Sequence, residues 1–391
     1  MKRALSLLII FLLTASCLFA QTQNTLSGSV KDSATGKPLA GASVFLNGTA
    51  KGTVTRADGT YVLAGIPGGR YELIISAIGY RTFVKDISSH ILPAVWNISL
   101  PEKASELEAV TVEPYDKDGW KKWGKFFMEN FVGTTENAAS CRFRSQKALR
   151  FHYSLKSKRL SVTATDPLIL ENKALGYTLE YRMESFVADF DTHIVSYSGY
   201  PFFQDIDDSS RQREWQRNRQ LAYMGSLMHF MRSLYNGRLQ QDGFIIEHEI
   251  QVPNIEKQRV KILYVPNVTK TDSIPMDTLH HYWEVLREPD YFIQKVKTYD
   301  GLLTESPNHV RSLFFTGDCT VIYGNGHLGI AYKESALELL TGQPVVVEEN
   351  GAYFPPQAVL TKGSWGETEK MANLLPRDYG MYGTIDLSRL P

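Results

Sequence analysis

The stretch from Gly41 to Arg81 constrains the fold of this chain more than any other, because strand pattern and turn chemistry agree along its length. Apolar residues alternate with polar ones in three short runs, as half-buried strands require. The runs are Ala42, Val44 and Leu46, then Tyr61 and Leu63, then Tyr71, Leu73 and Ile75. Strands recurring at this spacing predict an antiparallel β-sandwich.

Turn sequences separate the three runs. They are Asn47-Gly48, Asp58-Gly59 and Pro67-Gly68-Gly69. Glycine and asparagine tolerate positive φ, and proline fixes φ, so these residues suit tight reversals between antiparallel strands. In particular, Gly59 is predicted to have a positive φ, and a β-branched residue at this position should unfold the module. Residues 24–100 are therefore expected to fold alone.

The same residues form a series of short motifs. The series includes Gly41-Ala42-Ser43-Val44, Asn47-Gly48-Thr49, Asp58-Gly59-Thr60-Tyr61, Ile66-Pro67-Gly68-Gly69 and Gly79-Tyr80. It resembles the carboxypeptidase regulatory-like domain, from about Leu26 to about Leu100. The resemblance implies a seven-stranded transthyretin-like sandwich, classed with carbohydrate-binding-like folds and often fused ahead of TonB-dependent glycan transporters. Arg56 stands where the family usually has Asp, so the acid for a cation or polar site is missing there.

Composition places the chain among globular proteins and excludes a global electrostatic function. The chain has 391 residues, of which 43% are hydrophobic and 21% charged, enough for two or three domains. Lys plus Arg and Asp plus Glu both total 42, so the formal net charge is zero. No overall field attracts nucleic acid or an anionic membrane, and no nucleic-acid partner is expected.

The N-terminus has the layout of a secretory signal peptide over residues 1–20. Lys2 and Arg3 precede an apolar run, and residues 14–20 follow it up to Ala20, with Leu18 bulkier than the small residue usual at the third position before the cut. Cleavage after Ala20 would start the mature chain at Gln21, in the periplasm or at the outer membrane. No later stretch is long and apolar enough to span a bilayer as a helix.

Two alternatives remain for this segment. Thr14-Ala15-Ser16-Cys17 resembles a weak lipobox, which would make Cys17 a lipidated outer-membrane anchor. The other alternative is a retained membrane anchor. Under cleavage after Ala20, the mature chain keeps Cys141 and Cys319, which could form a disulfide in an oxidising compartment or remain two separate buried thiols.

Residues 101–115 are predicted to be a linker with an edge strand at 107–112, and residues 116–391 an α+β domain. An amphipathic helix begins near Asp116 and ends at Gly133, with its aromatic residues on a core-facing side. A second long helix opens near Asp207 and runs to Gly237. The expected fold class is mainly β, with an α+β C-terminal part that carries these two long amphipathic helices.

Strands are expected for most of the remaining C-terminal part. Residues 149–197 and 245–360 alternate as strands, and a short helix is predicted around residues 368–375, before Pro376. Gly324 to Gly329 fits a dinucleotide-binding glycine pattern, but strands flank it on both sides, which favours a hairpin with residues 320–322 opposite 328–330.

A basic cluster surrounds one tryptophan at the front of the second helix. The cluster is Arg211, Arg213, Trp215, Arg217 and Arg219. It could hold a phosphate or an acidic sugar. The alternative is a solvated basic face over a tryptophan that packs on the sheet, with Asp205, Asp207 and Asp208 as internal partners. This cluster is the binding site that the sequence proposes for the C-terminal part.

The sequence offers no convincing catalytic constellation. His281 and Glu284 have the His-x-x-Glu spacing of zinc carboxypeptidases, yet His309 and His327 follow too closely to supply that family's third ligand. In a strand over residues 279–286, His280 and His281 would point to opposite faces. No metal or cofactor is therefore expected, and no general acid and base can be singled out.

The C-terminal part resembles exported bacterial proteins that also follow a carboxypeptidase regulatory-like domain, a resemblance that implies no activity. It includes Leu374-Leu375-Pro376-Arg377-Asp378-Tyr379. The favoured hypothesis is a non-enzymatic envelope protein whose sandwich binds a glycan or docks onto an outer-membrane protein, in association with TonB-dependent uptake. The alternative hypothesis is a cell-envelope peptidase or glycosidase with catalytic carboxylates that the sequence does not reveal.

Overall fold

The computed structural model describes residues 24–103, 115–265, 274–297, 299–307, 309–325 and 330–380. The predicted signal peptide, Cys17 and the predicted edge strand at 107–112 lie outside these residues. The chain divides into two compact units. Unit 1 comprises Met1–Arg232, Glu348–Ala352 and Glu367–Pro391, and unit 2 comprises Ser233–Val347 and Tyr353–Gly366. The fold is mainly β, with antiparallel sheets and several helices in the C-terminal part, as expected.

The first seven strands form two sheets of unit 1. They are β1 (Leu26–Asp32), β2 (Ser43–Leu46), β3 (Gly52–Val54), β4 (Thr60–Leu63), β5 (Arg70–Ser76), β6 (Phe83–Ser88) and β7 (Ala94–Leu100), with a 3₁₀ turn η1 at Ser89–Ile91. One sheet has the order β4-β1-β7 and the other β3-β2-β5-β6. The alternating apolar residues of the sequence enter one core, in which Val44, Tyr61 and Leu73 are almost completely buried.

The other sheet of unit 1 has six strands. Its strands are β8 (Cys141–Phe143), β9 (Leu149–Ser154), β10 (Arg159–Ala164), β11 (Leu168–Asn172), β12 (Tyr177–Asp189) and β13 (Ile194–Asp205). The order is β8-β11-β12-β10-β9, and β13 pairs with β12. Two short helical turns, α3 (Glu136–Ala139) and η2 (Gln146–Ala148), connect the elements around β8.

Helix α2 (Gly119–Phe131) covers this sheet with aromatic side chains, as its sequence pattern predicted. Phe127 and Phe131 are buried, and the Phe127 ring lies 5.0 Å from that of Phe186 on β12. Gly133 follows the helix with a φ of 106°, a conformation that favours glycine. Dispersion and burial of these rings therefore fix the helix on the sheet.

The second long helix is interrupted, which corrects the prediction of one helix from Asp207 to Gly237. A 3₁₀ turn η3 (Ser209–Arg211) leads into α4 (Gln212–Tyr223), and α5 (Leu227–Tyr235) follows after a break. Gly225 lies in the break with a φ of 74°, and its N–H donates to Nδ1 of His229 at 3.1 Å. The apolar repeat continues through the break, so periodicity alone did not reveal it.

Unit 2 contains two sheets. The first has the order β15-β14-β18-β19-β22, with β14 (Phe244–Pro253), β15 (Tyr291–Lys297), β18 (Thr316–Asn325), β19 (Ile330–Leu339) and β22 (Val359–Gly363). The second has the order β16-β17-β20-β21, with β16 (Leu303–Glu305), β17 (Arg311–Leu313), β20 (Val345–Val347) and β21 (Tyr353–Phe354). A 3₁₀ turn η5 (Pro356–Ala358) precedes β22.

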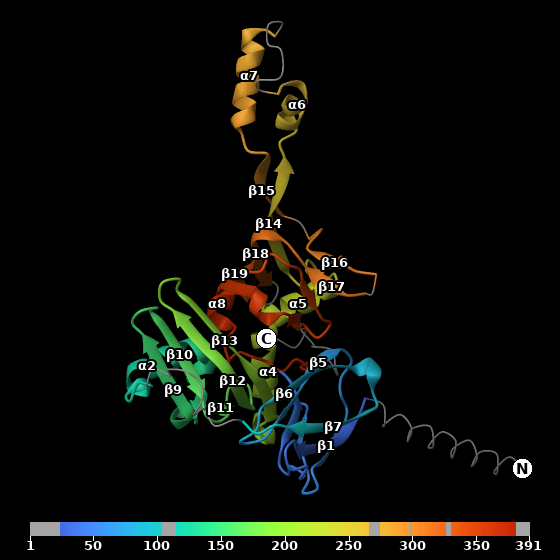
Figure 1. Cartoon of the computed structure of the whole chain (residues 1–391), viewed down its shortest axis with the longest axis vertical. Helices are drawn as coiled ribbons and strands as arrows, with labels where there is room; N and C mark the ends of the chain where they lie inside the picture. Colours follow the sequence, from blue (N-terminus) through green and yellow to red (C-terminus); the bar gives the residue numbers. More distant parts are fainter. Residues whose placement is uncertain are drawn as a thin grey trace, which may run out of the picture. The chain divides into compact units, whose positions relative to one another are not determined.

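Two helices interrupt the run of strands that was predicted over residues 245–360. They are α6 (Ile255–Leu263) and α7 (Met276–Arg287), and they lie at the end of the β14–β15 ribbon (Figure 1). Asn254 caps α6, since its side chain accepts a hydrogen bond from the Lys257 N–H at 2.9 Å. The strand considered for residues 279–286 is therefore wrong.

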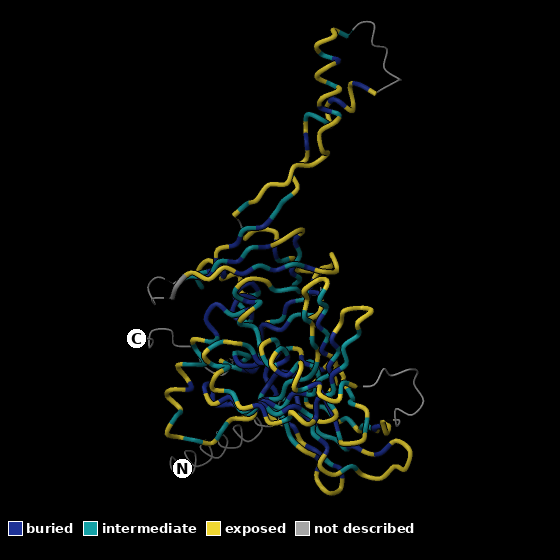
Figure 2. Tube along the Cα trace, turned by 90° about the vertical axis from the view of Figure 1, so that its left-hand side faces the viewer, coloured by how far each residue is buried: buried dark blue, intermediate teal, exposed yellow. Residues whose placement is uncertain are grey.

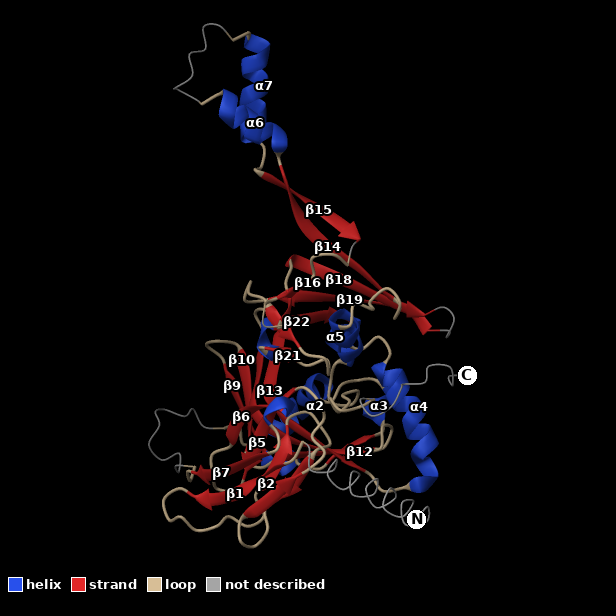
Figure 3. Cartoon of the chain, turned by 90° about the vertical axis from the view of Figure 1, so that its right-hand side faces the viewer, coloured by secondary structure: helices blue, strands red, loops and turns tan. Residues whose placement is uncertain are grey.

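Two further boundaries differ from the sequence-based expectation. A β18–β19 hairpin forms, but the predicted pairing of residues 320–322 with 328–330 is wrong. Gly324 lies within β18, Thr320 pairs with Ala336, and a bulge follows Tyr323. The last helix, α8, spans Ser364–Thr368 rather than residues 368–375. Figure 3 shows the division of the chain into strands and helices.

The Asp58-Gly59 turn provides the first prediction. Gly59 has a φ of 77°, and a Cβ there would lie 2.7 Å from the Val30 carbonyl oxygen and 2.9 Å from Pro38. Gly36 is the matched control, because its φ is 69° and a Cβ would meet nothing within 4 Å. Gly36→Val should cost only the backbone strain of about 1–2 kcal/mol, whereas Gly59→Val should cost at least twice as much.

Urea unfolding of a fragment of residues 24–103, followed by Trp96 fluorescence, measures both losses. Equal losses for the two variants would contradict a role for the close approach to Val30. A fragment that does not unfold cooperatively would contradict independent folding of the sandwich.

Candidate functional site

Trp215, at the centre of the predicted basic cluster, belongs to the core of unit 1. Only 1% of its surface is exposed, and its indole N–H donates to the Lys173 carbonyl at 3.0 Å. The ring lies against Gly176, where a Cβ would come within 2.2 Å of it. Gly176 also has a φ of 70°, so the close approach and the backbone both require glycine. A ligand at this cluster would not contact the indole face.

Arg219 is also used within the fold. Its guanidinium donates to the carbonyls of Leu175 at 2.7 Å and Gly176 at 3.2 Å, and to the Asp205 carboxylate at 2.9 Å. It lies 3.7 Å from the centre of the Tyr177 ring, and its side chain is only 13% exposed. These contacts close the turn between β11 and β12 against α4.

The remaining arginines of the cluster face solvent to different degrees. Arg211 forms a bidentate pair with Glu214, with N–O distances of 3.0 and 2.8 Å, and this pairing raises the pKa of Arg211 and lowers that of Glu214. Arg213 and Arg217 are exposed, and neither has an ion pair with a described residue. These two side chains are the part of the cluster that could meet an anion, and binding there stays a prediction.

The acidic residues expected to pair with the cluster have different roles. Asp205 pairs with Arg219, whereas Asp208 caps η3 by accepting from the N–H and hydroxyl of Ser210 at 3.0 and 2.6 Å. The Ser210 hydroxyl lowers the pKa of Asp208, as does the backbone N–H. Internal pairing thus accounts for Arg211 and Arg219.

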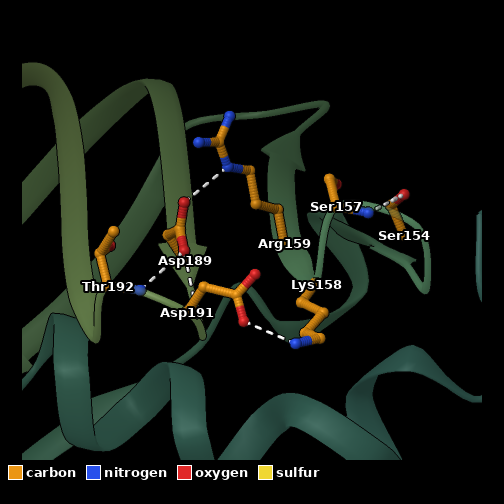
Figure 4. Close-up of polar contacts among 7 residues, drawn as sticks. All are labelled: Ser154, Ser157, Lys158, Arg159, Asp189, Asp191 and Thr192. Carbon is orange, nitrogen blue, oxygen red and sulfur yellow. Dashed lines mark hydrogen bonds and ion pairs between the residues drawn. The ribbon is translucent and has the colours of Figure 1, made fainter.

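A second polar cluster lies at the hairpin turns of the six-stranded sheet (Figure 4). Arg159 donates to Asp189 at 2.7 Å, and Lys158 donates to Asp191 at 2.7 Å. The Asp189 carboxylate also accepts from two backbone N–H groups, and the Thr192 N–H is the largest cause that lowers its pKa to about 2. These charges are paired with one another, and the carboxylate of Asp189 is only 14% exposed, so the group supports the turns rather than forms a reactive site.

The two cysteines are free thiols in the structure and belong to different units. Cys319 is buried on β18, and Cys141 is half-buried with its thiol 3.3 Å from the Asn137 carbonyl. Burial raises the pKa of each thiol to about 12, so neither is a thiolate at neutral pH. A disulfide between Cys141 and Cys319 stays a prediction.

The His-x-x-Glu motif lies on α7. His281 Nε2 is 3.0 Å from a carboxylate oxygen of Glu256 on α6, and both side chains are about half-exposed. Arg259 pairs with the same carboxylate and is the largest cause that lowers its pKa to about 2. No group of three or more metal-ligating side chains occurs within the described residues.

A feature that the sequence reasoning missed is a docking loop, residues 47–51, which joins the sandwich to the rest of unit 1. The Gly48 N–H donates to the Pro201 carbonyl at 2.8 Å, and the Phe203 N–H donates to the Thr49 carbonyl at 3.0 Å. The Arg377 N–H donates to the Gly48 carbonyl at 2.6 Å. Thr49 is completely buried, so the loop is an internal contact rather than a free turn.

Arg182 on β12 also contacts the sandwich. Its guanidinium donates to the hydroxyls of Ser76 at 2.7 Å and Ser43 at 3.1 Å, and it pairs with Glu180 at 2.6 Å. Its side chain is 15% exposed, and this burial lowers its pKa. A guanidinium buried here is tolerated because these groups accept hydrogen bonds from both of its Nη atoms, although its buried Nε has no hydrogen-bond partner among the described residues.

The sandwich leaves a different surface free, which we call the sheet face. It lies on the outer side of the β4-β1-β7 sheet and is formed by Ser27, Ser29, Thr60, Val62, Val95 and Asn97. The exposed Lys31, which pairs with Ser99, continues β1 on the same side. Two rows cross the sheet, since Ser27 pairs with Val62 and Val95 while Ser29 pairs with Thr60 and Asn97. Val95 is 70% and Val62 46% exposed. None of the six side chains is charged, so the face offers short hydroxyl, amide and methyl groups on a flat sheet.

Arg219 provides the second prediction. Arg219→Gln should lower the free energy of unfolding by about 2–3 kcal/mol, because it removes the partner of Asp205 and leaves buried carbonyls without a donor. The double variant Arg213→Gln with Arg217→Gln is the control and should change stability by less than about 0.5 kcal/mol, since both side chains are exposed. Chemical denaturation followed by far-UV circular dichroism measures both. A larger loss in the double variant would contradict this assignment of contacts.

No helix among the described residues is long and apolar enough to cross a membrane. Among solved structures, catechol 1,2-dioxygenase from Pseudomonas arvilla C-1 has 18% identity over 23% of this chain and 56% of its own, with a TM-score of 0.17. A Bacteroides fragilis protein of unknown function, described as membrane-associated, has 12% identity over 83% of this chain and 93% of its own, with a TM-score of 0.15. At these TM-scores, neither structure supports a statement about this chain.

The sequence comparisons concern the N-terminal sandwich. The TonB-dependent receptor SusC of Bacteroides thetaiotaomicron is 33% identical over 115 residues, which are 29% of this chain and 11% of the receptor. This chain therefore corresponds to a small part of that receptor. The family model for the CarboxypepD_reg-like domain matches residues 26–112. Residues 26–112 thus carry a CarboxypepD_reg-like domain, distantly homologous to a region of a SusC-type TonB-dependent receptor.

Proposed function

We propose that the chain is a non-enzymatic, exported envelope protein whose N-terminal sandwich docks onto an outer-membrane protein, in association with TonB-dependent uptake. The division of the sandwich surface supports this proposal. The docking loop at residues 47–51 is occupied by unit 1 itself, while the six residues of the sheet face are uncharged, with Val62 and Val95 exposed and Lys31 at their border. Uncharged, flat surfaces of this kind lose little solvation on docking, which suits a protein partner.

A protein partner fits the sheet face better than a glycan does. Sugar rings are usually bound by hydrogen bonds combined with stacking on aromatic side chains, and none of the six residues of the sheet face is aromatic. Trp96 on β7 is partly buried against the core, and the Lys85 ammonium lies 4.3 Å from the centre of its ring. Its ring therefore already has a cation over one face.

The finer parts of the proposal rest on the same domain. Seven strands in sheets of three and four agree with a transthyretin-like sandwich. The signal-like N-terminus and the SusC match support export to the periplasm or the outer membrane, with lipidation at Cys17 as the alternative anchor. A cell-envelope hydrolase remains the competing function and is tested alongside.

Site-specific photo-crosslinking in the producing cells tests the proposal. A photoreactive amino acid at Val95 should yield a discrete crosslinked outer-membrane protein. The same residue at Leu155, which is 84% exposed on a turn of the other sheet of unit 1, should not. Val95→Asp should reduce crosslinking from position 62 by tenfold or more, because a carboxylate would be desolvated in the interface, which costs at least about 1.4 kcal/mol.

Three results would contradict the proposal. Equal crosslinking from positions 95 and 155 would remove the sheet face as the docking surface. Release of peptides or reducing sugars from purified peptidoglycan or polysaccharide by the exported chain would favour the hydrolase. Binding of the chain to a glycan array that the Val95→Asp variant loses would favour a glycan ligand.

A further inference from the structure

Two side chains of metal-binding type lie opposite each other in the first sheet of unit 2, and we call them the His–Cys pair. His248 on β14 pairs directly with Cys319 on β18. Directly opposite residues of an antiparallel pair lie on the same face of the sheet, with Cβ atoms about 4.5–5.5 Å apart. Figure 2 colours the chain by burial, and its strands contain both buried and exposed residues. The His–Cys pair is on the buried side, since His248 is 7% and Cys319 0% exposed.

The imidazole of His248 lacks the partner that a buried polar group normally has. Its Nε2 atom is buried and has no hydrogen-bond partner among the described residues. A buried polar atom without a partner costs about 1–3 kcal/mol, so its presence calls for an explanation. Cys319 is a free thiol in the structure. An imidazole nitrogen beside a thiol sulfur is a pair of donors that suits a soft metal ion.

The surroundings of the His–Cys pair are apolar. In the same row across the sheet, the pair is flanked by Val296 on β15 and Leu337 on β19. The next row on this face contains Ile246 and Val321, which are both 1% exposed. Among the described residues of unit 2, no Lys, Arg, Asp or Glu is buried. The charge of an ion bound here must therefore be neutralised by its own two ligands.

Charge balance selects a monovalent cation for this pair. A thiol that binds a metal ion loses its proton, so the ligands supply one negative charge from the thiolate and none from the neutral imidazole. A monovalent ion then gives a neutral complex, whereas a divalent ion would leave one positive charge in apolar surroundings.

The number of donors selects the same class of ion. The described residues contain no group of three or more metal-ligating side chains, so the pair offers two donors from this part of the chain. Structural zinc takes four ligands in a tetrahedron. Cu(I) is soft, prefers thiolate, and is stable with two ligands in a line.

Strand geometry provides a suitable spacing and a short path from solvent. A linear sulfur–metal–nitrogen unit spans about 4.3 Å with bond lengths like those of zinc, which suits side chains from neighbouring Cβ atoms. A bulge adjoins the pair, because Glu249 pairs with Thr316 and the register skips the exposed Gly317 and Asp318. Bulges are frequent beside functional sites. This one places solvent one residue away from Cys319.

We propose that His248 and Cys319 form a two-coordinate site for a soft monovalent cation of the Cu(I) type. The ligands are the Nε2 atom of His248 and the Sγ atom of Cys319. Each bound ion displaces one thiol proton, which passes to solvent. The site belongs to unit 2 and does not depend on the docking function of the sandwich.

Anaerobic titration of the reduced chain from Gln21 onwards with Cu(I), in competition with the chelator bicinchoninate, tests the proposal. The chain should bind one equivalent of Cu(I). Cys319→Ala should abolish this binding, and His248→Leu should weaken it tenfold or more. Cys141→Ala removes the other thiol of this chain and is the matched control, so it should leave the binding unchanged. An equal concentration of Zn²⁺ should not displace the bound Cu(I).

X-ray absorption at the copper edge provides a readout that does not need a variant. The complex of the unmodified chain should show one sulfur and one nitrogen neighbour around the copper. This measurement decides the role of His248 if the His248→Leu chain does not fold, which far-UV circular dichroism checks for every variant.

Four results would overturn the proposal. The first is an unmodified chain that binds no Cu(I) in the competition. The second is binding that Cys319→Ala and His248→Leu leave as tight as the Cys141→Ala control, which would mean an adventitious ion only. The third is displacement of Cu(I) by Zn²⁺, which would contradict the charge balance. The fourth is a copper shell without nitrogen, which would remove His248 from the site.

Discussion

The contact between the docking loop and the rest of unit 1 determines what the sandwich can do. Three backbone hydrogen bonds join Gly48 and Thr49 to β13 and to the segment that follows α8. The Asp378 carboxylate, itself 9% exposed, accepts a further hydrogen bond from the Ala50 N–H at 3.1 Å. Because backbone groups on both sides are satisfied only by the contact, opening it would leave buried donors and acceptors without partners. The sandwich therefore presents its sheet face from a fixed support.

Arg182 adds an electrostatic constraint to the same contact. Its head group lies between a strand of the six-stranded sheet and two serines of the sandwich. Removing its partners would leave a buried cation, which costs about 3–5 kcal/mol, so Arg182 couples the two sheets. Helices α6 and α7 of unit 2 differ, because Ile255, Ile262 and Met276 on them are exposed.

Local turn chemistry allowed the sandwich to be predicted from the sequence. The tertiary contacts of the chain could not be predicted in this way. Asp58-Gly59 predicted a turn with positive φ because only the residues of the turn decide it, and Gly59 has that conformation. Gly225 did not reveal the break between α4 and α5, because Met224 and Leu227 continue the apolar repeat across it. Two signals for helices were present in the sequence, the capping residue Asn254 before α6 and Pro275 before α7. The strand alternation on either side of them favoured the prediction of strands instead. The docking loop joins residues more than 150 positions apart, which no local pattern encodes.

Hydrogen exchange of the Gly48, Phe203 and Arg377 amides tests the docking of the sandwich most directly. In the intact exported chain all three amides should exchange slowly, and replacing Arg182 by Gln should accelerate them together while the amides of the sandwich core stay protected. Rapid exchange of the three amides in the unmodified chain, at the rate of an open loop, would contradict the account. So would acceleration that spreads through the sandwich core, since the contact would then be part of its folding rather than a docking site.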